Sequence, residues 1–161
     1  MGKHSRVRSS TYFTTHARYL ERLKKDGLIE SETLNLIRLE QGNFRIKGRV
    51  ICRGGLELTV NKTLKASKLN SIQFVETVKY SYHLTTSDER DVFRYDNAHV
   101  HFYLGHRSEF HVHRFDEDGN EKHQSPYEIF DLEEWPTLAE VIQEADKFYW
   151  DSLYPLEQRL F

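Results

Sequence analysis

The chain has 161 residues, 30% charged and 13% aromatic, and its 23 Lys and Arg side chains nearly balance 25 Asp and Glu, for a net charge of −2. One average domain has about this length, so we expect a single globular unit, and the near-neutral charge excludes a general polyanion binder of histone type. No apolar run approaches the ~20 residues of a spanning helix. Cys52 is the single cysteine, which excludes disulfides and Cys-based zinc fingers. No signal peptide is visible, which predicts a cytoplasmic protein without membrane contact.

Charge is unevenly distributed along the sequence. Residues 1–25 hold seven basic side chains and one acidic, a net charge of +6, whereas residues 116–151 hold twelve acidic and two basic, a net charge of −10. This asymmetry predicts a basic surface near one end and an acidic surface near the other. The basic surface would suit nucleic acid or an acidic partner, and the alternative is two solvated faces without a partner.

The predicted elements begin after a basic flexible arm, which we assign to residues 1–12, and residues 13–161 are predicted to form one domain. Residues 13–25 have the periodicity of a helix: Ala17, Leu20 and Leu23 mark one face, and Gly27 follows its end. Between about 33 and 115 the apolar residues recur at every second position, which indicates strands.

The first clear strand is 44–52, where apolar residues alternate with Arg45, Lys47 and Arg49. A turn at 53–55 joins it to an alternating strand from Leu56, and residues 92–102 and 109–115 are predicted to be two later strands. The intervening strand is expected to present Phe74, Val78, Tyr80 and Tyr82 on one face and Thr77, Lys79, Ser81 and His83 on the other.

A final helix is predicted to begin at Pro136-Thr137, because Thr137 and Glu140 have the spacing of a capping box and apolar residues then recur at helical intervals to Tyr149. The expected fold class is therefore α+β: a single antiparallel sheet of about five or six strands, with an N-terminal and a C-terminal helix packed on it.

Histidine is the residue that points to chemistry. Six of the nine histidines fall within residues 83–113. His99 and His101 share one face of a predicted strand, and His111 and His113 share one face of the next. If these strands neighbour the one that carries His83, imidazoles, Lys79 and the Ser81 hydroxyl would share one sheet face; the clustered histidines are His83, His99, His101, His106, His111 and His113.

Three interpretations of this face remain open. A histidine pair supplies the base and the acid for metal-independent cleavage of RNA at its 2′-OH, and an Arg or Lys would stabilise the charge of the phosphate. Alternatively, two His-X-His pairs on adjacent strands would hold a divalent metal, with Asp96 as a further ligand. The third interpretation is a solvated, histidine-rich face without chemistry.

The sequence also resembles the TumE-like family of small bacterial and archaeal toxins, over roughly residues 18–148. The resemblance lies in a KYSYH run, an RYDNA run, two following histidine clusters and a C-terminal helix; these runs are Lys79-Tyr80-Ser81-Tyr82-His83 and Arg94-Tyr95-Asp96-Asn97-Ala98. His101, His111 and His113 match family histidines, whereas His99 falls where the family has proline. The resemblance implies a toxin that cleaves RNA and pairs with a cognate antitoxin.

We therefore predict a toxin-like endoribonuclease that needs no cofactor. His101 and His113 are expected to act as general base and acid, with His111 and His83 orienting them or binding phosphate. Arg94 and Lys79 would stabilise the charge of the phosphate in the transition state, and Asp96 would orient an imidazole or hold Arg94. Asn97 is expected to form a turn or bulge. Substrate contacts are expected from basic, aromatic and imidazole side chains on the same strands: Lys79, Tyr82, His99, Arg45, Lys47 and Arg49.

Two alternatives accompany this prediction: a non-catalytic module that binds nucleic acid or protein, and a metal-dependent nuclease. The expected partners are RNA and the antitoxin. An exposed edge strand and the aromatic side chains of Trp150, Tyr154 and Phe161 would also suit a homodimer.

Overall fold

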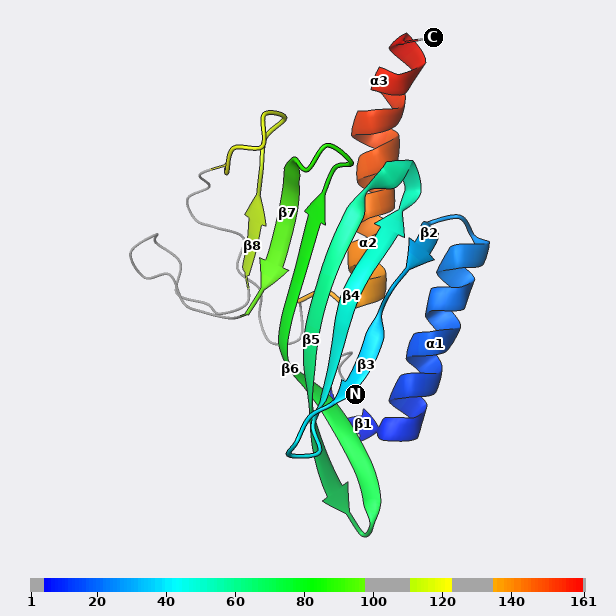
Figure 1. Cartoon of the computed structure of the whole chain (residues 1–161), viewed down its shortest axis with the longest axis vertical. Coiled ribbons are helices and arrows are strands. Elements are labelled where there is room, and N and C mark those ends of the chain that lie inside the picture. Colours follow the sequence, from blue (N-terminus) through cyan, green and yellow to red (C-terminus); the bar gives the residue numbers. More distant parts are fainter. Residues whose placement is uncertain (1–4, 98–110, 123–134, 161) are drawn as a thin grey trace.

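An antiparallel sheet forms the centre of the computed structural model, which describes residues 5–97, 111–122 and 135–160 (Figure 1). Its strands are β1 (Val7–Arg8), β2 (Ile29–Glu32), β3 (Asn35–Arg38), β4 (Phe44–Cys52), β5 (Glu57–Leu69), β6 (Ile72–Thr85), β7 (Asp91–Asp96) and β8 (His111–Arg114). Six strands follow the order β2-β4-β5-β6-β7-β8, while β1 pairs with β6 and β3 pairs with β4. The expected α+β class with one antiparallel sheet is confirmed.

The helices are α1 (Ser9–Lys25) and α2 (Leu138–Phe148), the latter extended by a π-helical turn (Tyr149–Leu153) and by α3 (Tyr154–Arg159). Both α1 and α2 pack on the same face of the sheet, where Leu20 and Leu23 of α1 share a core with Val141 and Ile142 of α2. Figure 1 shows α2 crossing behind the long strands and α1 beside them. None of the described helices is long and apolar enough to cross a membrane.

Alternation decides which side chains lie on each face of the sheet. Phe44, Ile46, Val50 and Cys52 are buried against the helices, as predicted, and the side chains between them point to the other face. Burial raises the pKa of the Cys52 thiol to about 12, which is typical of a core thiol and not of a nucleophile.

The N-terminal segment differs from its prediction. The first helix begins at Ser9, before the expected start at 13, and Val7 and Arg8 pair with Val75 and Phe74 of β6. Residues 7–12 of the predicted arm are therefore part of the folded domain, because β6 extends far enough to offer them an edge. The predicted end of the helix is confirmed, with Gly27 in the left-handed region at φ 81°.

One strand face was predicted incorrectly, because β6 contains a bulge. Lys79 pairs with Thr63 and Thr77 pairs with Leu64, so Val78 has no partner of its own in β5. The extra residue reverses the alternation below it. Tyr80 and Tyr82 are buried as expected, but Val78 is 45% exposed and Val75 is buried instead.

Asn97 holds this bulge from the neighbouring strand. Its Oδ1 accepts a hydrogen bond from the Tyr80 N–H at 2.9 Å, and its Nδ2 donates to the Val78 carbonyl at 3.0 Å. The side chain thus satisfies backbone groups of β6 at the point where β7 ends. This position fits the expectation that Asn97 forms a turn or bulge.

The C-terminal helix starts as predicted and is tied to the far edge of the sheet. Thr137 and Glu140 form both hydrogen bonds of the capping box. From the same helix, Glu144 accepts a hydrogen bond from the Tyr95 hydroxyl at 2.6 Å and pairs with Arg114 at 2.7 Å. These contacts join α2 to both β7 and β8.

Candidate functional site: an imidazole and carboxylate cluster

The three strands that carry the predicted site are neighbours, in the order β6-β7-β8. Across them His83 lies opposite Arg94 and Arg94 opposite His113, and in the next row Ser81 lies opposite Asp96 and Asp96 opposite His111. Side chains in register on adjacent strands share a face at about 5 Å spacing. The predicted gathering of His83, Arg94, Asp96, His111 and His113 is therefore present, on the face opposite α1 and α2.

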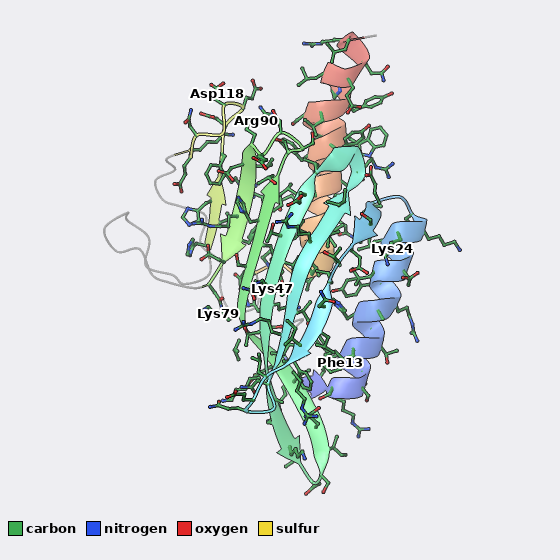
Figure 2. The ribbon with its side chains drawn as sticks, in the orientation of Figure 1. Phe13, Lys24, Lys47, Lys79, Arg90 and Asp118 are labelled. Atoms are coloured by element: carbon green, nitrogen blue, oxygen red, sulfur yellow. The ribbon has the colours of Figure 1, made fainter. Side chains whose placement is uncertain are left out.

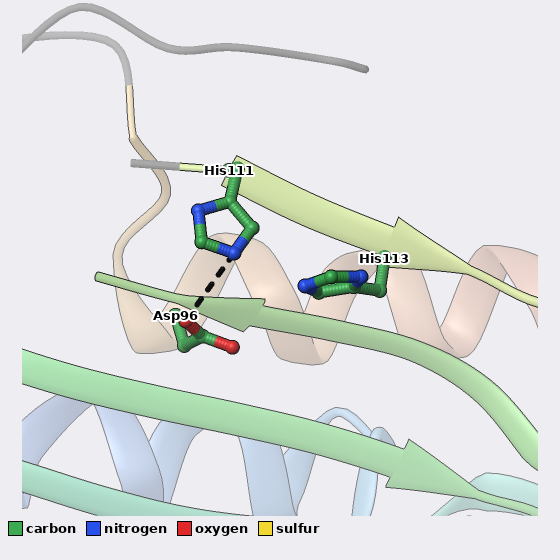
Figure 3. Close-up of side chains that lie close together, drawn as sticks. All are labelled: Asp96, His111 and His113. Atoms are coloured by element: carbon green, nitrogen blue, oxygen red, sulfur yellow. Dashed lines mark ion pairs between the residues drawn. The ribbon is translucent and has the colours of Figure 1, made fainter. Parts of the chain in front are cut away.

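Asp96 lies at the centre of this cluster (Figure 3). Its Oδ1 is 3.4 Å from Nε2 of His111, and its Oδ2 accepts a hydrogen bond from Nε of Arg94 at 3.1 Å. The rings of His111 and His113 meet edge to face, with 4.8 Å between their centroids. One carboxylate thus contacts both an imidazole and a guanidinium, the two groups that Asp96 was expected to orient or hold.

Two further carboxylates belong to the cluster, and sequence reasoning missed both. Nε2 of His83 is 2.6 Å from Oδ1 of Asp91, and Nδ1 of His113 is 2.5 Å from Oε1 of Glu121. Each described imidazole of the cluster is therefore paired with a carboxylate, an arrangement that fixes the orientation of the ring.

The reasons for missing them are local irregularities. Simple alternation along β7 would place Asp91 with Phe93 on the core face, but Leu84 pairs with Phe93 and Thr85 with Asp91, so a bulge at Val92 turns Asp91 to the polar face. Glu121 returns to β8 after a turn in which Asp116 accepts hydrogen bonds from the backbone of Asp118 and Asn120. The alternation of β8 does not reveal the carboxylate that this turn brings to His113.

Burial divides the cluster into an inner and an outer part. Relative exposure is 0% for His111 and 3% for both His113 and Asp96. The side chains of His83 and Arg94 are 35% and 38% exposed. Solvent therefore reaches the imidazole of His83 and the guanidinium of Arg94, and these two groups define the accessible edge of the cluster.

Basic side chains continue the same face across the sheet. Arg45 lies opposite Thr63 and Thr63 opposite Lys79, while Arg49 lies opposite Thr59 and Thr59 opposite His83. Figure 2 shows Lys47 and Lys79 on this face of the sheet. Of these four, Arg49 has a carboxylate neighbour, Glu57 at 3.4 Å. The predicted basic contacts Arg45, Lys47, Arg49 and Lys79 therefore share a face with the imidazoles.

Tyr82 requires a correction. It was expected to contact substrate, but its side chain is fully buried on the opposite, helix-covered face, where it stacks on Tyr80 with 5.3 Å between ring centroids. The alternation of β6 puts it on the other side from His83. The predicted roles of His101 and His99 fall outside the described residues.

The inner cluster has the composition of a metal site. One ligand atom from each of Asp96, His111 and His113 lies within 4.8 Å of the others, and all three residues are buried. Two imidazoles and a carboxylate suit a divalent transition metal. Without an ion, the same histidines are paired with carboxylates: Nε2 of His111 faces Asp96, and Nδ1 of His113 faces Glu121.

A comparison with known protein families places this geometry in context. Residues 17–148, which run from α1 to the end of α2 and include the whole cluster, match the family model described as Toxin TumE. No curated protein and no solved structure matches the chain. Because the match spans most of the sequence, the chain belongs to the TumE toxin family.

Proposed function

We propose that this TumE family member is an endoribonuclease that cleaves RNA by general acid–base catalysis at the imidazole and carboxylate cluster. The observation that carries the proposal is the row formed by His83, Arg94 and His113 on three adjacent strands, with a carboxylate beside each imidazole. A toxin needs a damaging activity, and a cluster of proton-transfer groups beside a cation fits phosphodiester cleavage.

In the proposed reaction the 2′-oxygen of a ribose attacks the adjacent phosphorus. One imidazole takes the 2′-OH proton, the bond from phosphorus to the 5′-oxygen breaks, and a second imidazole protonates that oxygen. His113, whose Nδ1 is held by Glu121, is our first candidate for one of these imidazoles. His101, His111 and His83 are the candidates for the second imidazole, and Arg94 would stabilise the charge on the phosphate.

The basic side chains on the same face would hold the flanking nucleotides. The strand that carries Arg45, Lys47 and Arg49 lies three positions from β7 in the sheet, or about 14 Å. A single-stranded RNA that crosses the sheet would place one phosphate at Arg94 and others near Lys79 and Lys47. Contacts of this kind bind the backbone without reading its sequence.

The test is incubation of the purified chain with a mixed RNA pool, with and without a chelator. We expect cutting in both conditions, and loss of cutting in His113→Gln and Arg94→Gln variants whose thermal unfolding remains cooperative. Arg18→Gln, a change on α1 on the other side of the sheet, is the matched control and should cut normally. Intact RNA in every condition would refute the proposal, and RNA that is bound but recovered uncut would favour the non-catalytic module.

A metal-dependent nuclease is the second candidate, and the mutual approach of Asp96, His111 and His113 supports it. Two imidazoles and one carboxylate would leave coordination positions open for water and a phosphate oxygen. Under this hypothesis a chelator abolishes cutting, and added Mn²⁺ or Zn²⁺ restores it in the wild type but not in His111→Gln.

A toxin must be silenced in the cell that makes it, so we also propose a cognate antitoxin that covers the polar sheet face. The exposed groups there, such as Lys47 and Lys79, would attract an acidic segment. Co-expression with the neighbouring open reading frame should rescue growth. Lys47→Glu combined with Lys79→Glu should weaken the complex, and an unchanged complex would place the antitoxin elsewhere.

A further inference from the structure

A pocket on the opposite side of the sheet is independent of the cluster. It has a volume of about 330 Å³ and lies between α1 and the core face of β5 and β6, with the first residues of α2 at its rim. The residues that matter for its chemistry are Tyr12, His16, Lys62, Glu76, Leu138 and Ala139.

Lys62 is the unusual member. It occupies an apolar position in the alternation of β5, between Val60 and Leu64, and is only 7% exposed. Within the described part of the chain no carboxylate lies within 4.0 Å of its Nζ, and its contact is with the ring of Tyr12, 5.2 Å from the centroid. Burying an ammonium without a counterion costs much free energy, so we expect Lys62 to have a functional role.

Other donors converge on the same pocket. The hydroxyl of Tyr12 is buried and has no hydrogen-bond partner among the described residues. Leu138 and Ala139 are the first residues of α2, and their N–H groups have no acceptor within the helix. The positive end of the helix dipole therefore faces a pocket that already contains a lysine.

The remaining titratable groups do not neutralise that lysine. His16 hydrogen-bonds Tyr19 at 3.0 Å, and burial, with Lys62 nearby, lowers its pKa to about 4. Glu76 lines the pocket without forming an ion pair with Lys62. Donors thus predominate at one end of the pocket, and Val75 and Leu138 provide apolar surface.

We infer that this pocket binds a small organic anion, a carboxylate or phosphate on an apolar body, with the anionic group between Nζ of Lys62, the Tyr12 hydroxyl and the start of α2. The volume suits a compound of this size. Since the pocket and the cluster lie on opposite faces of the sheet, the inference does not depend on RNA cleavage.

Isothermal titration calorimetry on the full chain tests this inference with four probes: benzoate, benzamide, phenyl phosphate and inorganic phosphate. We expect an anionic aromatic probe, benzoate or phenyl phosphate, to bind. Benzamide, the neutral analogue of benzoate, should bind at least about tenfold more weakly, since a charge-assisted hydrogen bond is lost. Inorganic phosphate should bind about tenfold more weakly than phenyl phosphate. Equal binding of benzoate and benzamide, or no binding of any anion, would overturn the inference.

Variants locate the site. Lys62→Met keeps the length of the side chain and should reduce anion affinity at least about tenfold, while the exposed Lys65→Met on the same strand should leave it unchanged. Tyr12→Phe, which retains the ring against Lys62, should weaken binding several-fold. Glu76→Gln tests whether Lys62 has an internal partner instead of a bound anion. A lowered melting temperature in this variant, together with no anion binding by the wild type, would show that Glu76 is the partner of Lys62.

Discussion

At the scale of single residues, the proposed catalysis depends on carboxylates that hold imidazoles in place. Glu121 contacts Nδ1 of His113, so we assign it a role that acts through the imidazole, as a positioning residue. An imidazole without its carboxylate has more freedom of orientation.

Glu121→Gln should therefore lower kcat for RNA cleavage at least about tenfold while changing KM little. Glu117→Gln, an exposed change in the same turn, is the control and should behave as the wild type. Steady-state kinetics on one oligonucleotide provide both constants. A rise in KM with unchanged kcat would show that Glu121 contacts the substrate instead.

His16 makes a prediction about stability. Its pKa is lowered from 6.5 to about 4 in the folded chain, chiefly by burial. As pH falls from 6.5 to 4, the unfolded chain binds a proton that the folded chain does not, so stability decreases, by at most about 3 kcal/mol. Urea unfolding across this range should show a shallower decrease in His16→Gln than in the wild type. Parallel curves would contradict the assignment.

At the scale of elements, the bulge in β6 and its support from Asn97 determine where the polar face ends. Asn97→Ala removes two hydrogen bonds to the backbone of β6 and should destabilise the fold by about 1–2 kcal/mol. Asn97→Asp keeps the acceptor for the Tyr80 N–H and should cost less. Urea unfolding of the wild type and the two variants measures the order of their stabilities. Equal stability of Asn97→Ala and the wild type would be inconsistent with this role.

Regular elements could be predicted from the sequence, and irregular ones could not. Alternation in β4 fixed the buried set from Phe44 to Cys52, and the Thr137 cap fixed the start of α2. The bulges at Val78 and Val92 add one residue each, which no periodicity reveals, and they reverse the faces beyond them. For that reason Val78 was assigned to the wrong face and Asp91 was overlooked.

The candidate site was predictable to the same extent. Matching alternation in separate segments was sufficient to bring His83, Arg94 and His113 together once the strands proved to be neighbours. Glu121 could not be found this way, because it reaches His113 through a turn and not through strand alternation. The burial of His111 depends on the whole packing and has no signal in the local sequence.

At the scale of the whole molecule, the sheet separates a helix-covered core from a polar face that carries cations and imidazoles. If RNA crosses that face, its affinity must fall with salt, since binding releases counterions. Lys47→Met should reduce the slope of log affinity against log salt by about 0.7, whereas Lys25→Met on α1 should not. Fluorescence anisotropy over a salt series measures both slopes, and identical slopes would remove Lys47 from the interface.

The most direct test of the central claim is the chemistry of the cut ends. Attack by a 2′-oxygen leaves a 2′,3′-cyclic phosphate on one fragment and a 5′-hydroxyl on the other, and mass spectrometry distinguishes these ends from those made by water. We predict cyclic phosphate ends from wild-type chain in the presence of a chelator, and no cutting of the same sequence with 2′-O-methyl riboses. Fragments with 3′-hydroxyl and 5′-phosphate ends, formed only when metal is present, would contradict catalysis by the imidazoles.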